Sequence, residues 1–583
     1  MNQFSNASRV NTIKIKFYWL AVTGLIMSIV IYGLSDRSFN SNRLTLTKLD
    51  TPSSFLIQGQ NASQKTLDVG GDITHQLAII NGVAANLTVK QSITLRQQGL
   101  IITPNHGVKS AGLAWGKRVG YSQASATQMA NAQPLHDARI FGDGVTIAVI
   151  DTGFKSLSGI RLDAYGRHRV YGTFDAIRNK TSMKNSDDSG HGSHVASVAV
   201  NSERDASGRY YGLAPDARLI SVKAFDMNGQ GKYADVIRGI EWAITYKDNY
   251  NIRILNMSFS AEPRSYYWQD PLNQAVMKAW QAGIVVVASA GNRGNSPMGI
   301  GVPGNVPYVI TVGAVTDAYT PDNFSDDRLA TFSSSGPTYE RFVKPDIVAP
   351  GGHIMGLMET RTNLAETYSE YHDGGQYFQM SGTSQSTGVV SGVISLMLSQ
   401  NSGLSPDDVK CRLMATAKAA RDDSGVWSYS AFEQGMGQVD AFGAVTSNVT
   451  GCANRGLDIS KDLNNEQHYA GPTMINERGE YFIRDHSDLA WNGVTDQTNG
   501  HLWTSASIWN DASIWNDASI WNDASIWNDA SIWNDASIWN DASIWNDASI
   551  WNDASIWNDA SIWNDASIWN DASIAINVWV EQE

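Results

Sequence analysis

The sequence predicts an α/β fold, with a doubly wound and mostly parallel sheet, between Gly144 and about Val445. Short runs rich in β-branched residues suit strands that are buried on both faces of such a sheet, and they span 145–150, 218–225, 252–259 and 283–289. Residues 233–246 and 271–282, which lie between these runs, carry apolar residues at helical spacing. Alternation of strands and helices implies right-handed crossovers and a sheet covered by helices on both faces.

Length and composition exclude several classes of protein. The chain has 583 residues, 42% of them apolar, so it is too long for one average domain and too apolar to be wholly disordered. The net charge of −14 argues against a nucleic-acid partner, and most of that charge lies in a repeat after Leu502. The only two cysteines, Cys411 and Cys452, exclude a Cys-rich zinc module or a disulfide-dense scaffold.

The N-terminus predicts export across the cytoplasmic membrane. Arg9, Lys14 and Lys16 precede residues 17–34, which carry no charge and are rich in Ile, Leu and Val. The basic flank is expected to stay inside while the rest is translocated. Residues 1–35 are therefore a signal peptide or a retained signal anchor in the membrane, and the protein is expected to be secreted, periplasmic or at the cell surface.

Changes in composition divide the rest of the chain into four parts. Residues 50–107 are expected to form a small α+β unit, with strand, helix and strand patterns from about Thr66 to Thr103, and a connector poor in periodicity follows over 104–140. The α/β domain is assigned to 120–445, a weakly patterned extension to 446–500, and a repetitive tail to 501–583.

The tail repeats the hexapeptide IWNDAS eleven times between Ile508 and Ser573. A six-residue period would spread the Trp side chains of a helix over three stripes, so a helix is disfavoured. In an extended chain each repeat restores the same two faces, because six is even, and stacked rungs would align Ile with Ile. A β-stacked tail and a disordered acidic tail both remain open. Its expected role is contact with a surface or polymer through exposed Trp, or that of a removable appendage.

Three small-residue segments carry groups suited to nucleophilic catalysis. Asp151 ends a predicted strand, His191 stands between glycines before a helix, and Ser384 lies in the turn before another helix. A serine hydroxyl becomes a nucleophile when an imidazole accepts its proton and a carboxylate orients that imidazole. A helix N-terminus also directs N–H groups at developing negative charge. Asp151, His191 and Ser384 can fill these roles.

These segments resemble the subtilases, the subtilisin-like serine peptidases. The matching motifs occur in order across about 140–445, and they are DTG, HGSHVAS, GLAPDARLISVKAF, NMSFS, VVVASAGN, YVITVGAV, KPDIVAPG and SGTSQS. The resemblance implies a sheet of subtilisin type, with Asp151 as the orienting carboxylate, His191 as general base and acid, and Ser384 as nucleophile. It also implies that Asn292 donates its side-chain amide to the oxyanion.

The resemblance further implies a groove that binds a polypeptide as an added strand. One wall of the groove is expected at Ser258, Phe259, Ser260 and Ala261, and the primary pocket is expected to be lined by Ala288, Ser289, Ala290 and Gly291. Gly301 is expected to leave the pocket floor open. These segments contain no acid, so we expect a large apolar or aromatic residue before the scissile bond, not Lys or Arg.

Other implications concern maturation and stability. Residues 50–107 are similar to subtilase pro-segments, which act as intramolecular inhibitors and chaperones, and cleavage is expected within 104–120. The chemistry is expected to need no cofactor. Whether a structural calcium ion binds stays open, and no ligands are assigned, because 201–212 lacks the best-known calcium-loop pattern. Cys411 and Cys452 form either a disulfide, favoured by export, or two free thiols.

Some residues depart from the family pattern or allow a purely structural interpretation. Gln385, Ser386 and Gly388 replace the residues usual after the nucleophile, and 352–377 is expected to be a surface insertion. His194 is expected to be structural, and Asp187 and Asp188 to belong to a solvated loop.

The sequence thus predicts an exported serine endopeptidase. Related acid-acting peptidases are disfavoured because they have Glu and Asp where this chain has His191 and Asn292. The alternative is an adhesive, surface-binding repeat protein in which the peptidase domain is vestigial.

Overall fold

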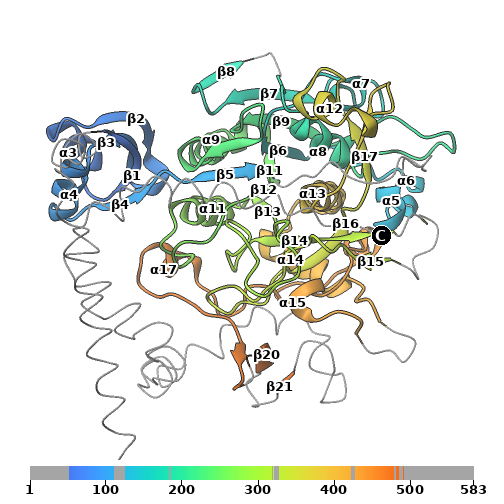
Figure 1. Cartoon of the computed structure of the whole chain (residues 1–583). Helices are drawn as coiled ribbons and strands as arrows, with labels where there is room; N and C mark the ends of the chain where they lie inside the picture. The colour runs from blue at the N-terminus through green and yellow to red at the C-terminus, as the bar shows by residue number, and fades with distance from the viewer. Residues whose placement is uncertain are drawn as a thin grey trace, which may run out of the picture.

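A central, mostly parallel sheet organises the molecule (Figure 1). The computed structural model describes residues 51–110, 125–182, 186–317, 320, 327–421, 427–477, 479, 481–484 and 490–491. Within them the sheet has nine strands in the order β15-β14-β13-β11-β6-β9-β7-β8, with β16 also paired to β14. The strands are β6 (Thr146–Asp151), β7 (Val170–Asp175), β8 (Lys180–Ser182), β9 (Arg218–Lys223), β11 (Ile252–Met257), β13 (Val285–Ser289), β14 (Ile310–Thr316), β15 (Arg328–Leu329) and β16 (Ile347–Pro350).

The sheet is doubly wound about β6. After β6 the chain forms β7 and β9 on one side, then crosses to β11, β13, β14 and β16 on the other, and all these neighbours pair in parallel. Only the edge pairs β7–β8 and β14–β15 are antiparallel. In such sheets functional groups gather beyond the carboxyl ends of strands near the reversal of strand order, and Asp151 is the last residue of β6. The fold class predicted from the sequence is confirmed.

Helices cover both faces of the sheet. The helices α8 (His191–Val200) and α13 (Thr383–Gln400) pack on each other, and α9 (Tyr233–Thr245) packs on α11 (Pro271–Gln281). Ile150 of β6 faces Gly239 of α9, whereas Asn256 of β11, which pairs with the adjacent Val149, accepts a hydrogen bond from Ser391 of α13. Because neighbouring strand residues point to opposite faces, the two helix pairs lie on opposite sides.

The remaining helices are short or lie at the rim. They are α5 (Ser125–Met129), α6 (Gln133–Asp137), α7 (Ser158–Arg161), α10 (Lys247–Tyr250), α14 (Pro406–Thr416), α15 (Ala431–Gln434), α16 (Ala441–Thr446) and α17 (Ile459–Leu463). The expected insertion at 352–377 contains β17 (Ile354–Leu357), α12 (Asn363–Thr367) and η2 (Ser369–Tyr371), and β17 pairs with β18 (Tyr377–Met380). The strands β19 (Thr473–Ile475), β20 (Tyr481–Arg484) and β21 (Ala490–Trp491) form a small sheet after α17.

A separate α+β unit precedes the main sheet. Its antiparallel sheet has the order β2-β3-β1-β4 and carries its own apolar cluster, which includes Ile57, Val83 and Leu95. Its elements are β1 (Ser53–Gln58), α3 (Ala62–Asp68), β2 (Asp72–Leu77), η1 (Ala78–Ile80), β3 (Gly82–Leu87), α4 (Val89–Gln97) and β4 (Ile101–Pro104). A capping box between Thr88 and Gln91 starts α4. The strand and helix patterns begin earlier than Thr66, because β1 precedes this residue and α3 already contains it.

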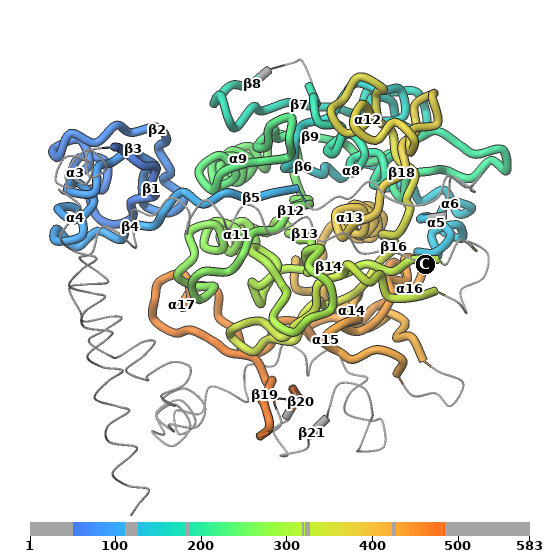
Figure 2. The backbone as a smooth tube through the Cα atoms, viewed as in Figure 1, coloured from blue at the N-terminus to red at the C-terminus, as the bar shows by residue number. Residues whose placement is uncertain are grey.

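This unit is docked on α9 and α11. Gln58 donates to Gln274 at 2.7 Å, and the N–H of Ile79 donates to Glu241 at 3.1 Å. Beyond the unit, β5 (Gly107–Ser110) runs between β10 (Gln230–Lys232) and β12 (Phe259–Ser260), antiparallel to both. Figure 2 shows β5 leaving the small unit and entering the main body. The first residues of the expected connector thus form a strand, because two open strand edges supply the hydrogen bonds that order them.

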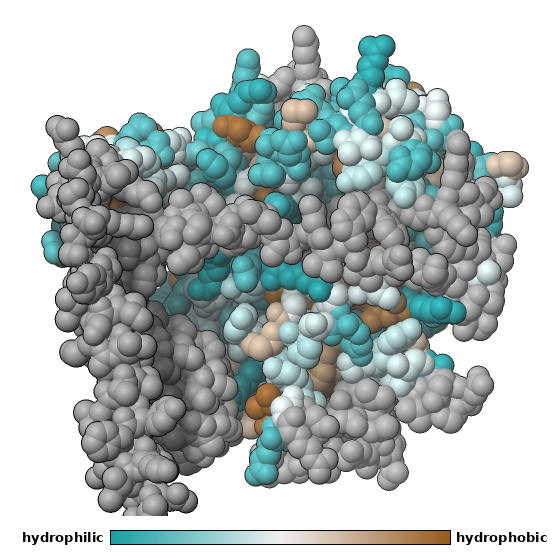
Figure 3. Space-filling model, viewed as in Figure 1, coloured by the Kyte–Doolittle hydropathy of each residue, from teal (hydrophilic) through white to brown (hydrophobic). Residues whose placement is uncertain are grey.

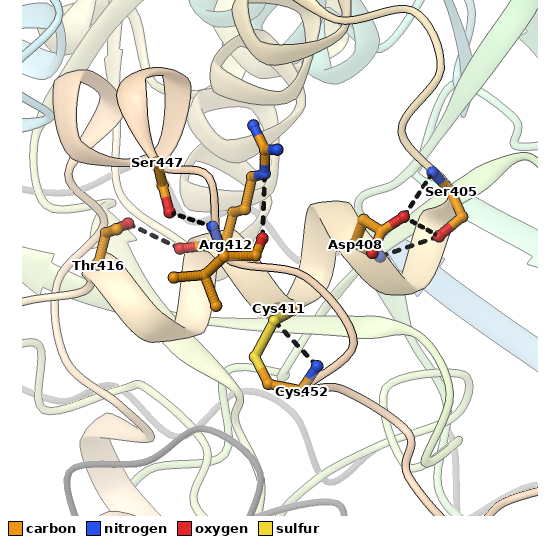
Figure 4. Close-up of a disulfide and its surroundings, with 8 residues drawn as sticks. Ser405, Asp408, Cys411, Arg412, Thr416, Ser447 and Cys452 are labelled. Atoms are coloured by element: carbon orange, nitrogen blue, oxygen red, sulfur yellow. Dashed lines mark hydrogen bonds between the residues drawn. A yellow bond between two sulfur atoms is a disulfide. The ribbon is translucent and has the colours of Figure 1, made fainter.

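A disulfide joins α14 to the segment after α16. Cys411 and Cys452 are bonded with a Cα–Cα distance of 5.2 Å. Figure 4 shows the bond, with the Cys452 N–H directed at the Cys411 sulfur at 3.1 Å. The disulfide interpretation, rather than two free thiols, therefore describes the structure.

Two expectations lie outside the described residues: the export segment at 1–35 and the repeat tail. Among the helices that the structure does describe, none has the length and apolar character needed to cross a bilayer. The view in Figure 3 shows a described surface that is mainly hydrophilic or neutral, with scattered hydrophobic residues.

Candidate active site

Asp151 and His191 meet where β6 ends and α8 begins. Asp151 Oδ1 accepts a hydrogen bond from His191 Nδ1 at 2.7 Å, and both side chains are 1% exposed. A donating Nδ1 leaves the other ring nitrogen of a neutral imidazole as an acceptor. This atom, His191 Nε2, is buried and has no hydrogen-bond partner. The pair thus presents an oriented imidazole with one nitrogen available for a proton.

Ser384 is the second residue of α13 and lies against the groove. Its hydroxyl donates to the carbonyl oxygen of Ser258 at 3.0 Å. Because it stands in the first turn of a long helix, it lies among backbone N–H groups that have no acceptor within the helix. Negative charge that develops beside Ser384 is therefore favoured.

Asn292 follows the end of β13 by three residues and is fixed beside the nucleophile segment. Its side-chain oxygen accepts from the N–H of Thr383 at 3.1 Å and from the Thr383 hydroxyl at 2.8 Å. Thr383 directly precedes Ser384, so the Asn292 amide and the serine are held side by side.

Strand β5 occupies a groove between β10 and β12. Ser110 pairs with Phe259, and Lys109 pairs with Ser260. On the other side the N–H of Ser110 donates to Gly229 O at 3.0 Å. The described part of β5 ends one pair before Ser258, the residue whose carbonyl contacts Ser384. The groove therefore holds an extended chain as the middle strand of a three-stranded antiparallel sheet, aimed at the serine.

The segments expected to form the primary pocket lie together. Ser289 donates through its hydroxyl to Phe259 O at 2.8 Å, and the N–H of Gly301 donates to Ala290 O at 3.2 Å. Ala261 pairs with Val302, the residue after Gly301.

The floor of this region differs from the expectation. A methyl group at Gly301 would collide with the Ser260 hydroxyl, and one at Gly291 would lie 3.1 Å from it. The Ser260 oxygen is buried without a hydrogen-bond partner. Gly301 therefore makes room for the Ser260 side chain and does not leave an open floor. The sequence did not reveal this arrangement, because the direction of a side chain cannot be deduced from sequence alone.

His194 is structural, as expected. Its Nε2 lies 3.2 Å from Ile354 O and 3.0 Å from Phe378 O, so it carries the proton and donates. Its Nδ1 accepts from Gln385 Nε2 at 3.3 Å. Burial lowers the pKa of His194 to about 3, so the ring stays neutral near neutral pH.

The departures from the family pattern after Ser384 are packing features. Gln385 reaches across to His194 on α8, as described above. A methyl group at Gly388 would lie 3.0 Å from Val195 O of the same helix, so glycine lets α13 approach α8 closely.

Asp187 corrects the expectation of a solvated loop. It is fully buried and accepts five hydrogen bonds, whereas the side chain of its neighbour Asp188 is 62% exposed. The sequence carries one signal that points to this: the N-cap of α8 is Gly190, which has no side chain to cap the helix, so a nearby Asp is a natural substitute. Among the described residues no group of three or more His, Cys, Asp or Glu side chains is arranged to hold a metal ion.

Comparison with known proteins decides the family. Residues 142–437 match the sequence model of the Subtilase family, which is half of the chain. The chain belongs to the subtilase family of subtilisin-type serine proteases. It is 41% identical over 293 residues to serine protease AprX of Bacillus subtilis, a match that covers 49% of this chain and 64% of AprX.

Other relatives match a larger share of the chain. The thermostable alkaline protease of Halalkalibacterium halodurans is 32% identical over 59% of this chain and 80% of its own length. Subtilisin E of Bacillus subtilis is 31% identical over 61% of this chain and 81% of its own length. Fervidolysin of Fervidobacterium pennivorans, a keratinolytic enzyme related to subtilisin, has a similar fold, with a TM-score of 0.52, 21% identity and coverage of 76% of this chain and 68% of its own.

Proposed function

We propose that this subtilase is an exported serine endopeptidase that cleaves polypeptides through an acyl-enzyme. Ser384 Oγ attacks the carbonyl carbon while its proton passes to His191 Nε2, and Asp151 stabilises the imidazolium that forms. The oxyanion accepts hydrogen bonds from the Ser384 N–H and the Asn292 amide. The C–N bond then breaks, and His191 gives its proton to the leaving nitrogen. Water, deprotonated by the same imidazole, hydrolyses the ester and restores the Ser384 hydroxyl.

Substrate binding itself prepares the nucleophile in this proposal. The Ser258 carbonyl accepts the Ser384 hydroxyl in the structure. A substrate that continues the register of β5 brings an N–H group to Ser258, and antiparallel pairing directs that N–H to the same carbonyl. The substrate N–H then competes with the hydroxyl for this oxygen, which favours the turn of the hydroxyl to His191 Nε2. Productive binding and activation are coupled through one oxygen atom.

The observation that carries the proposal is the Asp151–His191 hydrogen bond at the start of α8, a helix that packs on α13, whose first turn carries Ser384. A fluorophosphonate probe tests it, because the probe reacts only with an activated serine. We expect labelling of the wild type and of Ser381→Ala, a neighbouring buried serine, and none of Ser384→Ala. Absence of labelling in the wild type would favour the alternative, an adhesive repeat protein with a vestigial peptidase domain.

We further propose that the primary pocket takes an apolar residue and rejects Lys and Arg, because no carboxylate lies among the residues that line it. The Ser260 hydroxyl limits its depth. Profiling with a peptide library should show apolar residues before the scissile bond, and Ser260→Gly should shift the preference toward the largest aromatic side chains, by roughly ten-fold. A profile dominated by basic residues would contradict this assignment.

Residues 50–107 are proposed to be the inhibitory pro-segment. Its support is β5, which directly continues this segment into the substrate groove, and the contacts of Gln58 and Ile79 with α11 and α9. In the register of β5, a substrate residue one position beyond the partner of Phe259 would face Ser258, which predicts cleavage after Ala111. N-terminal sequencing of the mature enzyme should therefore begin at Gly112, and Ser384→Ala should remain uncleaved if processing is autocatalytic.

A further inference from the structure

Asp187 is a buried carboxylate that the proposed chemistry leaves without a task. Its Oδ1 accepts from the Thr152 hydroxyl at 2.9 Å and from the N–H groups of Ser189 and Gly190 at 3.1 and 2.8 Å. Its Oδ2 accepts from the N–H and the hydroxyl of Ser193 at 2.8 and 2.7 Å. Two carboxylate oxygens offer about four lone-pair directions, so five donors saturate them. Such complete compensation is what allows a charge to be buried.

The five donors come from two segments that carry the Asp–His pair. Thr152 directly follows Asp151 at the end of β6, while Gly190 and Ser193 lie on either side of His191 in the first turn of α8. Asp187 therefore ties the end of the strand to the start of the helix. It also replaces the side-chain cap that a glycine N-cap cannot provide, and its negative charge suits a helix N-terminus.

A second chain of hydrogen bonds connects Asp187 with the catalytic carboxylate itself. The Thr152 hydroxyl accepts from Gly192 N–H at 2.9 Å and donates to Asp187. The Thr152 N–H donates to Asp151 Oδ1 at 2.7 Å, and this oxygen is the one that accepts His191 Nδ1. Thr152 thus contacts both the residue that orients the imidazole and the helical turn that carries it.

We propose that Asp187 is a positioning residue that holds the His191 ring in line between Asp151 and Ser384. The inference rests on the proposed function, since it needs His191 to carry the proton. No hydrogen bond of Asp187 reaches β10 or β12, which bind the substrate. A shift of about 1 Å in a proton-transfer group costs about 10²-fold in rate. The effect of losing Asp187 therefore falls on kcat and leaves KM nearly unchanged.

The test replaces Asp187 with Asn and uses Asp188→Asn as a matched control. Asn keeps the shape but has one acceptor oxygen, so at least two of the five donors lose their partner. Asp188→Asn removes the same charge one residue away, from an exposed side chain. With active sites counted by fluorophosphonate titration, we expect kcat per site to fall at least ten-fold in Asp187→Asn, with KM within two-fold. Asp188→Asn should stay within two-fold of the wild type in both.

A second pair of variants decides the question if Asp187→Asn does not fold. Thr152→Val keeps Asp187 and the Thr152 N–H that bonds Asp151, but it removes the hydroxyl that joins Asp187 to the N–H of Gly192, so kcat should fall with KM unchanged, and Thr152→Ser should recover most of it. An unchanged kcat per titrated site in either Asp187→Asn or Thr152→Val overturns the proposal, as does an equal loss in Asp188→Asn. A wild type without peptidase activity would instead refute the proposed function, so the two failures are distinguishable.

Discussion

Two histidines lie one turn apart on α8 and have opposite chemical characters. His191 lies at the junction with β6, and His194 lies against the β17–β18 hairpin. Both are buried, His191 at 1% exposure and His194 at 0%. His191 is bound to a carboxylate through one nitrogen and keeps the other nitrogen unpaired. His194 uses one nitrogen on two backbone carbonyls and the other on Gln385.

The difference shows what makes a buried histidine reactive. A neighbouring carboxylate stabilises the imidazolium, and an unpaired nitrogen gives the proton a place to bind. His194 has neutral partners only and no unpaired nitrogen, and burial holds its pKa at about 3. The two residues therefore share identity and burial, and their partners alone separate the proposed catalytic histidine from the structural one.

The largest expected effect comes from breaking the reactive member of the pair. His191→Ala removes the proton acceptor, so kcat/KM should fall by about 10⁴-fold or more, while Tm stays within about 3 °C of the value for Ser384→Ala. The measurement is peptide hydrolysis after the pro-segment has been cleaved by added wild-type enzyme. Retention of more than one percent of the activity would show that His191 is not the base.

Cys452→Ser should alter stability without altering chemistry, because the disulfide lies in neither histidine region. The bond joins residues 41 positions apart, and loss of the cross-link should lower the free energy of unfolding by about 4 kcal/mol on the chain-entropy estimate. Urea unfolding of the Ser384→Ala protein, which cannot digest itself, gives this value with and without the second change. The kcat of the folded Cys452→Ser enzyme should equal that of the wild type.

His194→Ala sharpens the comparison from the other side. It leaves two buried carbonyls without this donor and opens a cavity, so the free energy of unfolding should fall by about 2–4 kcal/mol. The remaining folded enzyme should keep most of its kcat. A kcat loss as large as that of His191→Ala would contradict the structural role.

The same variant carries a pH dependence with a definite sign. The folded pKa of His194, about 3, lies below the ordinary value of 6.5 because burial disfavours the charged ring. As pH falls from about 6.5 toward 3, the His194 side chain therefore binds a proton in the unfolded chain but not in the folded protein. The contribution of His194 to the free energy of unfolding decreases over this range. The stability gap between the histidine protein and His194→Ala should thus be widest above pH 7 and narrow at pH 5, as urea titrations in the Ser384→Ala background would show.

The smallest effect is expected from removing the tail. A protein that ends near Gly500 should hydrolyse soluble peptides at the wild-type rate, since the proposed catalytic residues all precede Ser386. It should lose retention on cells or insoluble substrate if the repeat binds a surface. Slower hydrolysis of soluble peptides by the shortened protein would show that the tail takes part in catalysis.

The sequence predicted the parts of this structure that local pattern determines. The β-branched runs at 145–150 and 283–289 became β6 and β13, because continuous apolar runs need burial on both faces. Motif order placed Asp151 and His191 at the strand end and helix start where they meet.

What the sequence did not predict depends on tertiary contacts. Strand β5 has only four residues and no alternating pattern, and its order comes from two partner edges far along the chain. The burial of Asp187 follows from five donors contributed by the fold, and its exposed neighbour Asp188 has the same side chain. The direction of the Ser260 hydroxyl depends on how two glycine-containing turns approach each other.

The covalent attachment of β5 has a consequence for where and when the enzyme works. While the chain is intact, the strand competes for the groove at the effective concentration set by its tether, so dilution does not displace it. In the proposed maturation, cleavage would turn this intramolecular occupancy into an ordinary bimolecular equilibrium that weakens as the released fragment diffuses away. In a small, closed compartment the released fragment would stay concentrated and keep the cut enzyme inhibited. In a large extracellular volume the fragment would be diluted and the enzyme would become active, so the volume around the enzyme sets when proteolysis begins.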